Sequence, residues 1–206
     1  MNDFSETKER IFDVFIELTS ALGYENVTTR DIAKKIGINS ASIYYHFKSK
    51  EQILEFVYDY YSRYQYDTRK PVDMMKKLIE TANAEEMVSS FFYTFETEDQ
   101  KKYVRMILIT KIIYMRLFQD PIANTMFAKG NANNAEYVIE ILKHGIDKGR
   151  IAADFDVETF ADMLIGAKTF MGIKAFAGAA YVVGQLDEEQ RLLALLTRLY
   201  STALRE

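Results

Sequence analysis

Four side chains that can hydrogen-bond to phosphate or to base edges lie close together in the sequence: Tyr44, Tyr45, His46 and Lys50. Phenol, imidazole and ammonium groups all form such bonds with nucleic acids. Any one of them alone would suit a solvated helix face, with His46 as a hydrogen-bonding group near a helix end. Together, inside a basic segment and beside apolar residues at core spacing, they indicate a surface that contacts phosphate.

The residues just before this group predict a short helix that ends in a tight turn. Thr28 and Asp31 have the spacing of a capping box, so the helix is expected to begin there. Ile32 and Ile36 lie four residues apart and share one buried face. Gly37 suits the left-handed residue at which a helix commonly ends.

A second short helix is predicted after the turn. Asn39 or Ser40 can cap its start, and Ile43 and Phe47 form its buried stripe. Its other face carries Ser40, Ala41, Tyr44, Tyr45 and His46. That face would be a poor core surface, but it suits a groove between phosphates.

A third helix is predicted to start at Ser49, because Gln52 follows at capping-box spacing. This start places Lys50 in the first turn, where a cation is unfavourable unless an anion lies nearby. A phosphate group would supply that anion. The two short helices have the plan of a helix-turn-helix, in which the second helix enters the major groove.

This segment resembles the DNA-binding signature of the TetR family of bacterial transcriptional regulators. The resemblance covers roughly residues 8–54 and rests on Thr28, Ile32-Ala33, Gly37, Tyr44-Tyr45-His46-Phe47 and Lys50-Glu51. The remaining residues resemble the family only in length and helical pattern.

The resemblance implies that Thr28, Tyr44, His46 and Lys50 contact phosphate, whereas Ser40, Ala41 and Tyr45 are placed to reach base edges. Arg30 could reach a guanine edge, although it could equally pair with Asp31 or a phosphate. The full predicted DNA-binding set is Thr28, Thr29, Arg30, Asn39, Ser40, Ala41, Tyr44, Tyr45, His46 and Lys50. Small side chains make direct hydrogen-bonded readout sparse, so water and DNA shape would carry much of the specificity.

Charge is distributed unevenly along the chain. The net charge of −4 argues by itself against a general nucleic-acid binder. Residues 28–50, however, hold five lysine or arginine residues and one aspartate, a net charge of +4, which leaves −8 for the rest. One end of the protein is therefore expected to meet a polyanion.

The 206 residues predict an all-α protein, because prolines occur only at positions 71 and 121 and alternating apolar runs with hairpin turns are absent. We expect a helix-turn-helix DNA-binding domain over residues 1–50 and a helical effector-binding and dimerisation domain over 51–206. A helix opened by Asp156 is expected to run to about Val183, and Asp187 with Gln190 is expected to open the last helix. The apolar stripes of these last two helices permit a homodimer, as the resemblance implies, although they could simply be core.

Aromatic and methionine side chains are numerous in the expected second domain, and most are expected to be core. Some are predicted to line a pocket for a largely apolar small-molecule effector, as the resemblance implies. The candidates are Phe91, Phe95, Tyr103, Met106, Tyr114, Phe118, Phe127, Tyr137, Phe170 and Met171. Lys111, Arg116, Lys168 and Lys174 could bind an anionic head group, although ion pairs or plain exposure are the simpler interpretations.

The expected function is that of a DNA-binding transcriptional regulator, a ligand-responsive repressor that binds a palindromic operator as a homodimer. The alternative is a DNA-bound adaptor whose helical body binds a protein. An enzyme is not expected, because nucleophile elbow, phosphate loop, thiol and His-carboxylate cluster are all lacking from the sequence. No cofactor or metal is predicted. Without a signal pattern or a stretch long enough to span a bilayer, we expect a cytoplasmic protein with no membrane partner.

Overall fold

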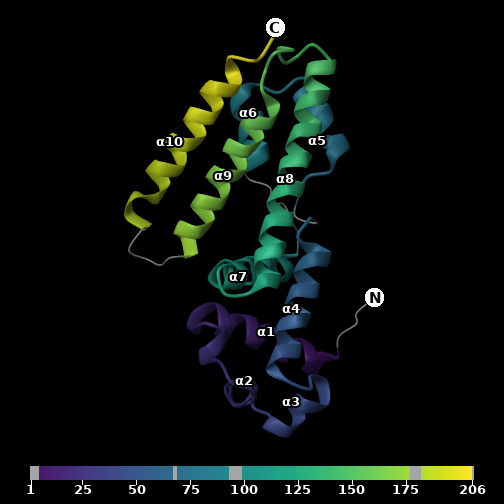
Figure 1. Cartoon of the computed structure of the whole chain (residues 1–206), viewed down its shortest axis with the longest axis vertical. Coiled ribbons are helices and arrows are strands. Elements are labelled where there is room, and N and C mark those ends of the chain that lie inside the picture. Colours follow the sequence, from purple (N-terminus) through teal and green to yellow (C-terminus); the bar gives the residue numbers. More distant parts are fainter. Residues whose placement is uncertain (1–4, 67–68, 93–98, 177–181, 206) are drawn as a thin grey trace. The chain divides into compact units, whose positions relative to one another are not determined.

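The protein is built from helices. The structure, a computed structural model, describes residues 5–66, 69–92, 99–176 and 182–205, with the side chains of all these except 182–188. Within these ranges the chain forms ten α-helices and one 3₁₀ turn (Figure 1). Ile151 and Leu204 add an isolated antiparallel bridge. The predicted all-α class is confirmed.

The chain packs as two units, each with its own apolar core. The first unit comprises residues 1–67 and 97–127, and the second comprises residues 68–96 and 128–206. We expected the DNA-binding domain to end near residue 50. The division by packing does not test this functional boundary, which stays a prediction.

The first unit is centred on α1 (Glu6–Leu22), which packs against α2 (Thr29–Ile36) and α7 (Gln100–Arg116). It also contains η1 (Tyr24–Asn26), α3 (Ser40–His46), α4 (Lys50–Tyr64) and the beginning of α8 (Pro121–Asp147). One buried cluster joins them, with Ile11, Phe12, Phe15, Ile32, Ile43, Phe47, Met106 and Ile109 among its members. The short helices of the turn therefore share a core with the much longer α7.

The second unit contains α5 (Val72–Ile79), α6 (Ala84–Phe92), the remainder of α8, α9 (Val157–Phe176) and α10 (Val182–Ser201). In it α10 packs against α6 and lies beside α9 (Figure 1). Its core includes Met75, Ile79, Phe91, Ile141, Phe160 and Tyr200. The ring centroids of Phe160 and Tyr200 lie 5.6 Å apart, within the usual separation of interacting aromatic pairs.

The C-terminal helices differ from the expectation in two respects. The helix that Asp156 opens, α9, is Val157–Phe176 and does not reach Val183, which belongs to α10. Asp156 caps α9 as predicted, because its Oδ1 accepts the N–H of Thr159 at 2.9 Å. The last helix, however, already includes Val182, so Asp187 lies inside α10 rather than at its start. The prediction failed because a spacing of three residues also joins neighbours on one helix face, so it does not by itself mark an end.

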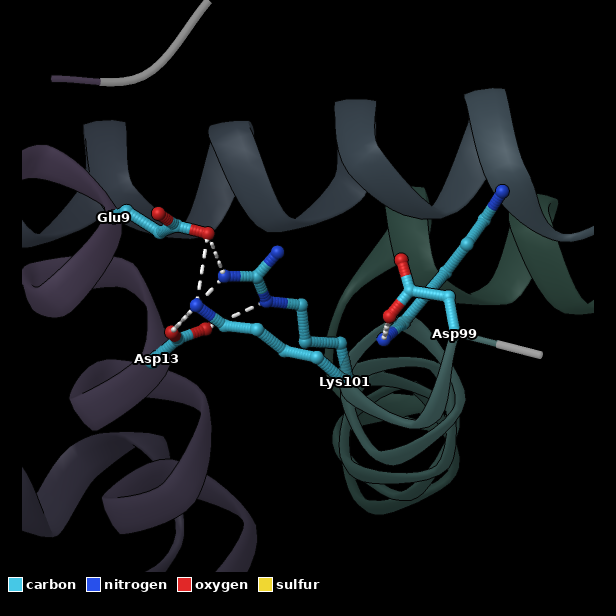
Figure 2. Close-up of polar contacts among 6 residues, drawn as sticks. Glu9, Asp13, Asp99 and Lys101 are labelled. Carbon is cyan, nitrogen blue, oxygen red and sulfur yellow. Dashed lines mark hydrogen bonds and ion pairs between the residues drawn. The ribbon is translucent and has the colours of Figure 1, made fainter. Parts of the chain in front are cut away.

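An ion-pair cluster fastens α7 to α1. Arg105 donates from Nε to Asp13 Oδ1 at 2.7 Å and from Nη2 to Asp13 Oδ2 at 2.9 Å and Glu9 Oε1 at 2.6 Å. Figure 2 shows Lys101 reaching the same two carboxylates, at 2.9 Å from Glu9 and 3.4 Å from Asp13. The hydrogen bonds from Arg105 and Lys101 hold the pKa of Glu9 below its ordinary value. The Arg105 guanidinium also lies 5.6 Å from the ring of Phe12, within reach of a cation–π contact.

We expect Arg105→Gln to lower the free energy of unfolding by about 1–3 kcal/mol, because it leaves two partly buried carboxylates facing each other with one cation fewer. Urea denaturation followed by circular dichroism measures the change. Arg63→Gln is the matched control, since Arg63 and Asp59 form an exposed pair at 3.7 Å. That variant should lose less than about 0.5 kcal/mol. Equal losses in the two variants would contradict a structural role for the cluster.

Candidate nucleic-acid interface

The first helix of the turn begins with a complete capping box. Thr28 Oγ1 accepts the backbone N–H of Asp31 at 3.2 Å, and Asp31 Oδ2 accepts the backbone N–H of Thr28 at 2.9 Å. The Thr28 hydroxyl also donates to the same carboxylate oxygen at 2.6 Å. These bonds lower the pKa of Asp31, the bond from the Thr28 side chain being the largest cause. The predicted start of α2 is confirmed.

The turn between the two helices has the expected left-handed residue. Gly37 has φ 74° and ψ 35°, a conformation that side chains disfavour. Asn39 is the cap of α3, because its Oδ1 accepts the N–H of Ala41 at 2.9 Å. Arg10 of α1 donates to the carbonyl of Ile36 at 2.8 Å and so satisfies an acceptor at the end of α2.

One face of α3 packs into the core, and the opposite face is exposed to solvent. Ile43 is fully buried and Phe47, the residue that ends the helix, is 2 % exposed. Tyr44 and Tyr45 are 53 % and 88 % exposed. An exposed fraction of this size is unusual for aromatic side chains and leaves both rings available for a partner.

Other predicted contact residues lie on the exterior of the same segment. The hydroxyls of Thr29 and Tyr44 lie 3.3 Å apart, which links α2 to the outer face of α3. The rings of Tyr45 and His46 meet edge to face at 5.2 Å. Arg30 and Ala41 are exposed, and Ser40 is half-buried. Asp31 bonds Thr28 through Oδ2, and the partner of Arg30 stays a prediction.

Lys50 lies in the first turn of α4, as predicted. Ser49 caps this helix by accepting the N–H of Gln52 at 3.2 Å. The Lys50 ammonium donates to the backbone carbonyl of Tyr24 at 3.0 Å and lies 3.9 Å from the centre of the Tyr24 ring. Reasoning from the sequence missed Tyr24, because no periodic or capping pattern links residues this far apart.

The predicted ligand residues fall into both packing units. Met106 is buried in the core of the first unit, Tyr114 packs edge to face on Phe127 at 5.5 Å, Tyr103 is half-buried, and Phe118 is 93 % exposed. In the second unit Phe91, Tyr137 and Met171 are buried, whereas Phe170 is 54 % exposed. Phe95 lies outside the described residues.

A groove of about 460 Å³ lies in the second unit between α8 and α9. Its lining is mostly apolar and includes Ala132, Ala135, Ile165, Phe170 and Ile173. Of the predicted ligand residues whose positions are described, Phe170 alone lines it. The ligand site therefore stays a prediction.

Comparison with known proteins finds relatives among bacterial regulators. Residues 11–57 match the family described as bacterial regulatory proteins, tetR family. The chain is 22 % identical over 164 residues to the HTH-type transcriptional regulator SrpR of Pseudomonas putida, an alignment that covers 80 % of this chain and 72 % of SrpR. The chain thus carries a tetR-family segment over residues 11–57, and its likeness to SrpR extends over most of its length.

A second relative supports the same assignment. The chain is 32 % identical over 99 residues to IcaR of Staphylococcus aureus strain Newman, the biofilm operon icaADBC HTH-type negative transcriptional regulator. That alignment covers 48 % of this chain and half the length of IcaR. Both relatives are transcriptional regulators, and the comparisons support the same role, that of a DNA-binding transcriptional regulator, for this chain.

Two solved structures share the fold of this chain. A transcriptional regulator from Saccharomonospora viridis in complex with choline superposes with a TM-score of 0.64 at 20 % identity, covering 98 % of this chain and all of that one. The SmeT–triclosan complex superposes with a TM-score of 0.65 at 16 % identity, covering 98 % of this chain and 93 % of SmeT.

Two further findings concern other classes of site. Among the residues with described positions, no three histidine, cysteine or acidic side chains group so that they could hold a metal ion. In the same part of the chain, no helix combines the length and the apolar character needed to cross a membrane.

Replacing Thr28 with valine should raise the pKa of Asp31 toward that of an ordinary aspartate, because the hydroxyl is the main group that stabilises the carboxylate. A carboxylate whose pKa is lowered by folding stabilises the fold above its unfolded pKa, and this stabilisation is lost as the pH falls through the folded pKa. The valine variant should therefore lose less stability on acidification than the parent. Carbon-13 NMR titration of the aspartate carboxyls measures the shift directly.

Thr159→Val is the matched control, since the Thr159 hydroxyl bonds Asp156 at 2.7 Å and lowers its pKa in the same way at the start of α9. It should raise the pKa of Asp156 and leave that of Asp31 unchanged. An Asp31 pKa that is the same in the parent and in Thr28→Val would show that the capping box is not formed in solution.

Proposed function

We propose that this chain is a ligand-responsive repressor that binds a palindromic operator as a homodimer. The observation that carries the proposal is the division of α3, in which Ile43 and Phe47 are buried while Tyr44 and Tyr45 face solvent. A helix that hides its apolar face and exposes two aromatic hydroxyls is suited to the major groove.

The proposed contacts divide into two kinds. Thr28, Tyr44, His46 and Lys50 bind phosphate and fix the position of the duplex, and Thr29 and Asn39 flank them. Ser40, Ala41 and Tyr45 face the base edges, with Arg30 available for either role. Six of these ten side chains are exposed and four are half-buried. Their positions and the net charge of +4 over residues 28–50 support this division.

The homodimer is proposed to form through α9 and α10. Each recognition helix reads only a few base pairs, so two copies must be held together to read two half-sites. Exposed apolar side chains on these helices support the proposal: Met163, Phe170 and Ile173 on α9, and Leu195 on α10.

The regulatory sign and the effector are proposed from relatives. IcaR is a negative regulator, which supports repression. The complexes of two structural neighbours with choline and with triclosan support a small-molecule effector here, and the apolar groove between α8 and α9 suits a largely apolar one. Effector and operator would then weaken each other's binding by a common coupling free energy, typically about 1–3 kcal/mol.

One observation favours a second candidate function. The groove opens to solvent along α9, where Phe170 and Ile173 are exposed. An adaptor that binds a helix of another protein would use such a surface. In both versions we propose a cytoplasmic protein without enzymatic activity, because bacterial operator DNA lies in the cytoplasm and the proposed chemistry is binding alone.

Fluorescence anisotropy with duplexes from the region upstream of the chain's own coding sequence tests the proposal. We expect sequence-selective binding that weakens as salt is raised. Tyr45→Ala should change the preferred sequence, with about 1–3 kcal/mol less discrimination at the base pair it faces. Lys50→Ala should weaken binding to every duplex and reduce the salt slope by about 1.

Lys143→Ala is the control for the loss of a positive charge. Lys143 lies on α8 in the second unit and pairs with Glu158 of α9 at 2.8 Å. Its affinity and salt slope should match those of the parent. The proposal is wrong if the parent protein binds no upstream duplex selectively at any concentration that supports a dimer.

A further inference from the structure

Tyr24 lies where two cations meet. It is half-buried in η1, just before the helix-turn-helix, and its ring packs edge to face on the buried Phe15. The Lys50 ammonium lies 3.9 Å from the ring centre, and the Arg116 guanidinium carbon lies 4.3 Å from it. Both distances are within the range of a cation–π contact. One aromatic ring thus joins the first turn of α4 to the last turn of α7.

The Lys50 ammonium has a second attachment to the same residue. It donates to the Tyr24 carbonyl at 3.0 Å, and that carbonyl also accepts the N–H of Val27 at 3.3 Å. A lysine side chain normally samples many rotamers, so two contacts to one residue restrict where its charge lies. Because an ammonium has three N–H donors and the carbonyl takes one, two remain for phosphate oxygens.

Carboxylates balance the two cations around the ring. The Tyr24 hydroxyl donates to Glu51 Oε1 at 3.1 Å, and Arg116 lies 3.6 Å from Glu25 and 3.0 Å from Asp120. Two cations beside one ring would otherwise repel each other. Burial and the bond to Glu51 raise the pKa of Tyr24 to about 12, so the ring stays neutral and its hydroxyl stays a donor.

Arg116 ties this arrangement to helices beyond the DNA-binding turn. Its Nε donates to the Tyr58 hydroxyl at 3.2 Å and to Asp120 Oδ2 at 3.1 Å. Tyr58 lies on α4, and Asp120 accepts the backbone N–H of Ile122 at 2.9 Å at the start of α8. The guanidinium is therefore held by two elements while it contacts the ring.

We propose that Tyr24 is a positioning residue for DNA binding, which holds the Lys50 ammonium in place for a phosphate of the duplex and is itself held by Arg116 from the end of α7. The inference rests on the proposed phosphate contact of Lys50. Lys50 then enters the complex with its charge already placed, which reduces the entropy lost on binding. A displacement of the last turn of α7 changes phosphate affinity through Tyr24, without any change in α3.

A double-mutant cycle on the full chain tests the inference. Kd and its salt dependence are measured with a short random-sequence duplex, because phosphate contacts do not depend on sequence. Lys50→Ala should reduce the salt slope by about 1. Tyr24→Leu should weaken binding roughly 2- to 5-fold, the value of an exposed cation–π contact, and move the slope part of the way toward that of Lys50→Ala.

The decisive comparison is Tyr24→Leu in the Lys50→Ala background. A positioning role predicts no further loss of affinity there, whereas a purely structural role predicts the same fold-loss in both backgrounds. Tyr24→Phe keeps the ring and should bind within about twofold of the parent. Tyr64→Leu is the matched control, since Lys102 lies 4.6 Å from the Tyr64 ring away from the turn, and its affinity should not change.

The outcomes separate the two proposals. If Lys50→Ala leaves the salt slope unchanged, the phosphate contact assigned to Lys50 is wrong and the inference falls with it. If Lys50→Ala reduces the slope but Tyr24→Leu costs the same in both backgrounds, the inference alone is wrong.

A second measurement does not depend on the folding of Tyr24→Leu. In the parent protein labelled with ¹³Cε-lysine, the ring current of Tyr24 should move the Lys50 ε-methylene resonance upfield, and Lys50→Ala identifies that resonance by its loss. Arg116→Gln should move it back toward the value of a free lysine. An unshifted Lys50 resonance in the parent would overturn the inference.

Discussion

The burial of Ile43 and Phe47 beneath α1 is the constraint on which the interface depends. Both side chains belong to the cluster that contains Ile11, Phe12 and Phe15, and the ring of Phe47 meets that of Phe56 of α4 at 5.7 Å. Residues four apart share one helix face, so this packing turns the side chains between them outward. The exposure of Tyr44 and Tyr45 is therefore a consequence of core packing and needs no separate cause.

The two short helices rely on this core for their stability. With eight and seven residues, α2 and α3 are far too short to persist alone in water. The capping box at Thr28, the left-handed Gly37 and the Asn39 cap set where each helix begins or ends, and the apolar contacts with α1 supply most of the stabilisation. Polar residues close together in the sequence therefore set the ends of the two helices. Apolar residues far apart in the sequence hold the helices in place.

The sequence predicted features whose causes lie within a few residues of each other. Thr28 with Asp31 and Ser49 with Gln52 are such cases, and the structure confirms both caps. Contacts between distant residues could not be predicted: Arg105 meets Glu9 across most of the first unit's sequence, and Lys50 meets Tyr24 through a turn whose geometry no spacing reveals. The predicted start of α10 was wrong although its signal was local, because the spacing of Asp187 and Gln190 is equally typical of a helix interior.

The ion-pair cluster between α1 and α7 also fixes how α1 is rotated about its own axis. Glu9 and Asp13 lie about one helical turn apart, so both carboxylates can meet Arg105 only at one rotation of α1 about its own axis. A slip of one residue would turn the helix by about 100° and carry both carboxylates away from the guanidinium. Arg105 therefore fixes the rotation of α1 about its own axis. Because α2 packs on α1 and α3 on α2, this rotation also fixes the direction in which α2 and α3 project from α1.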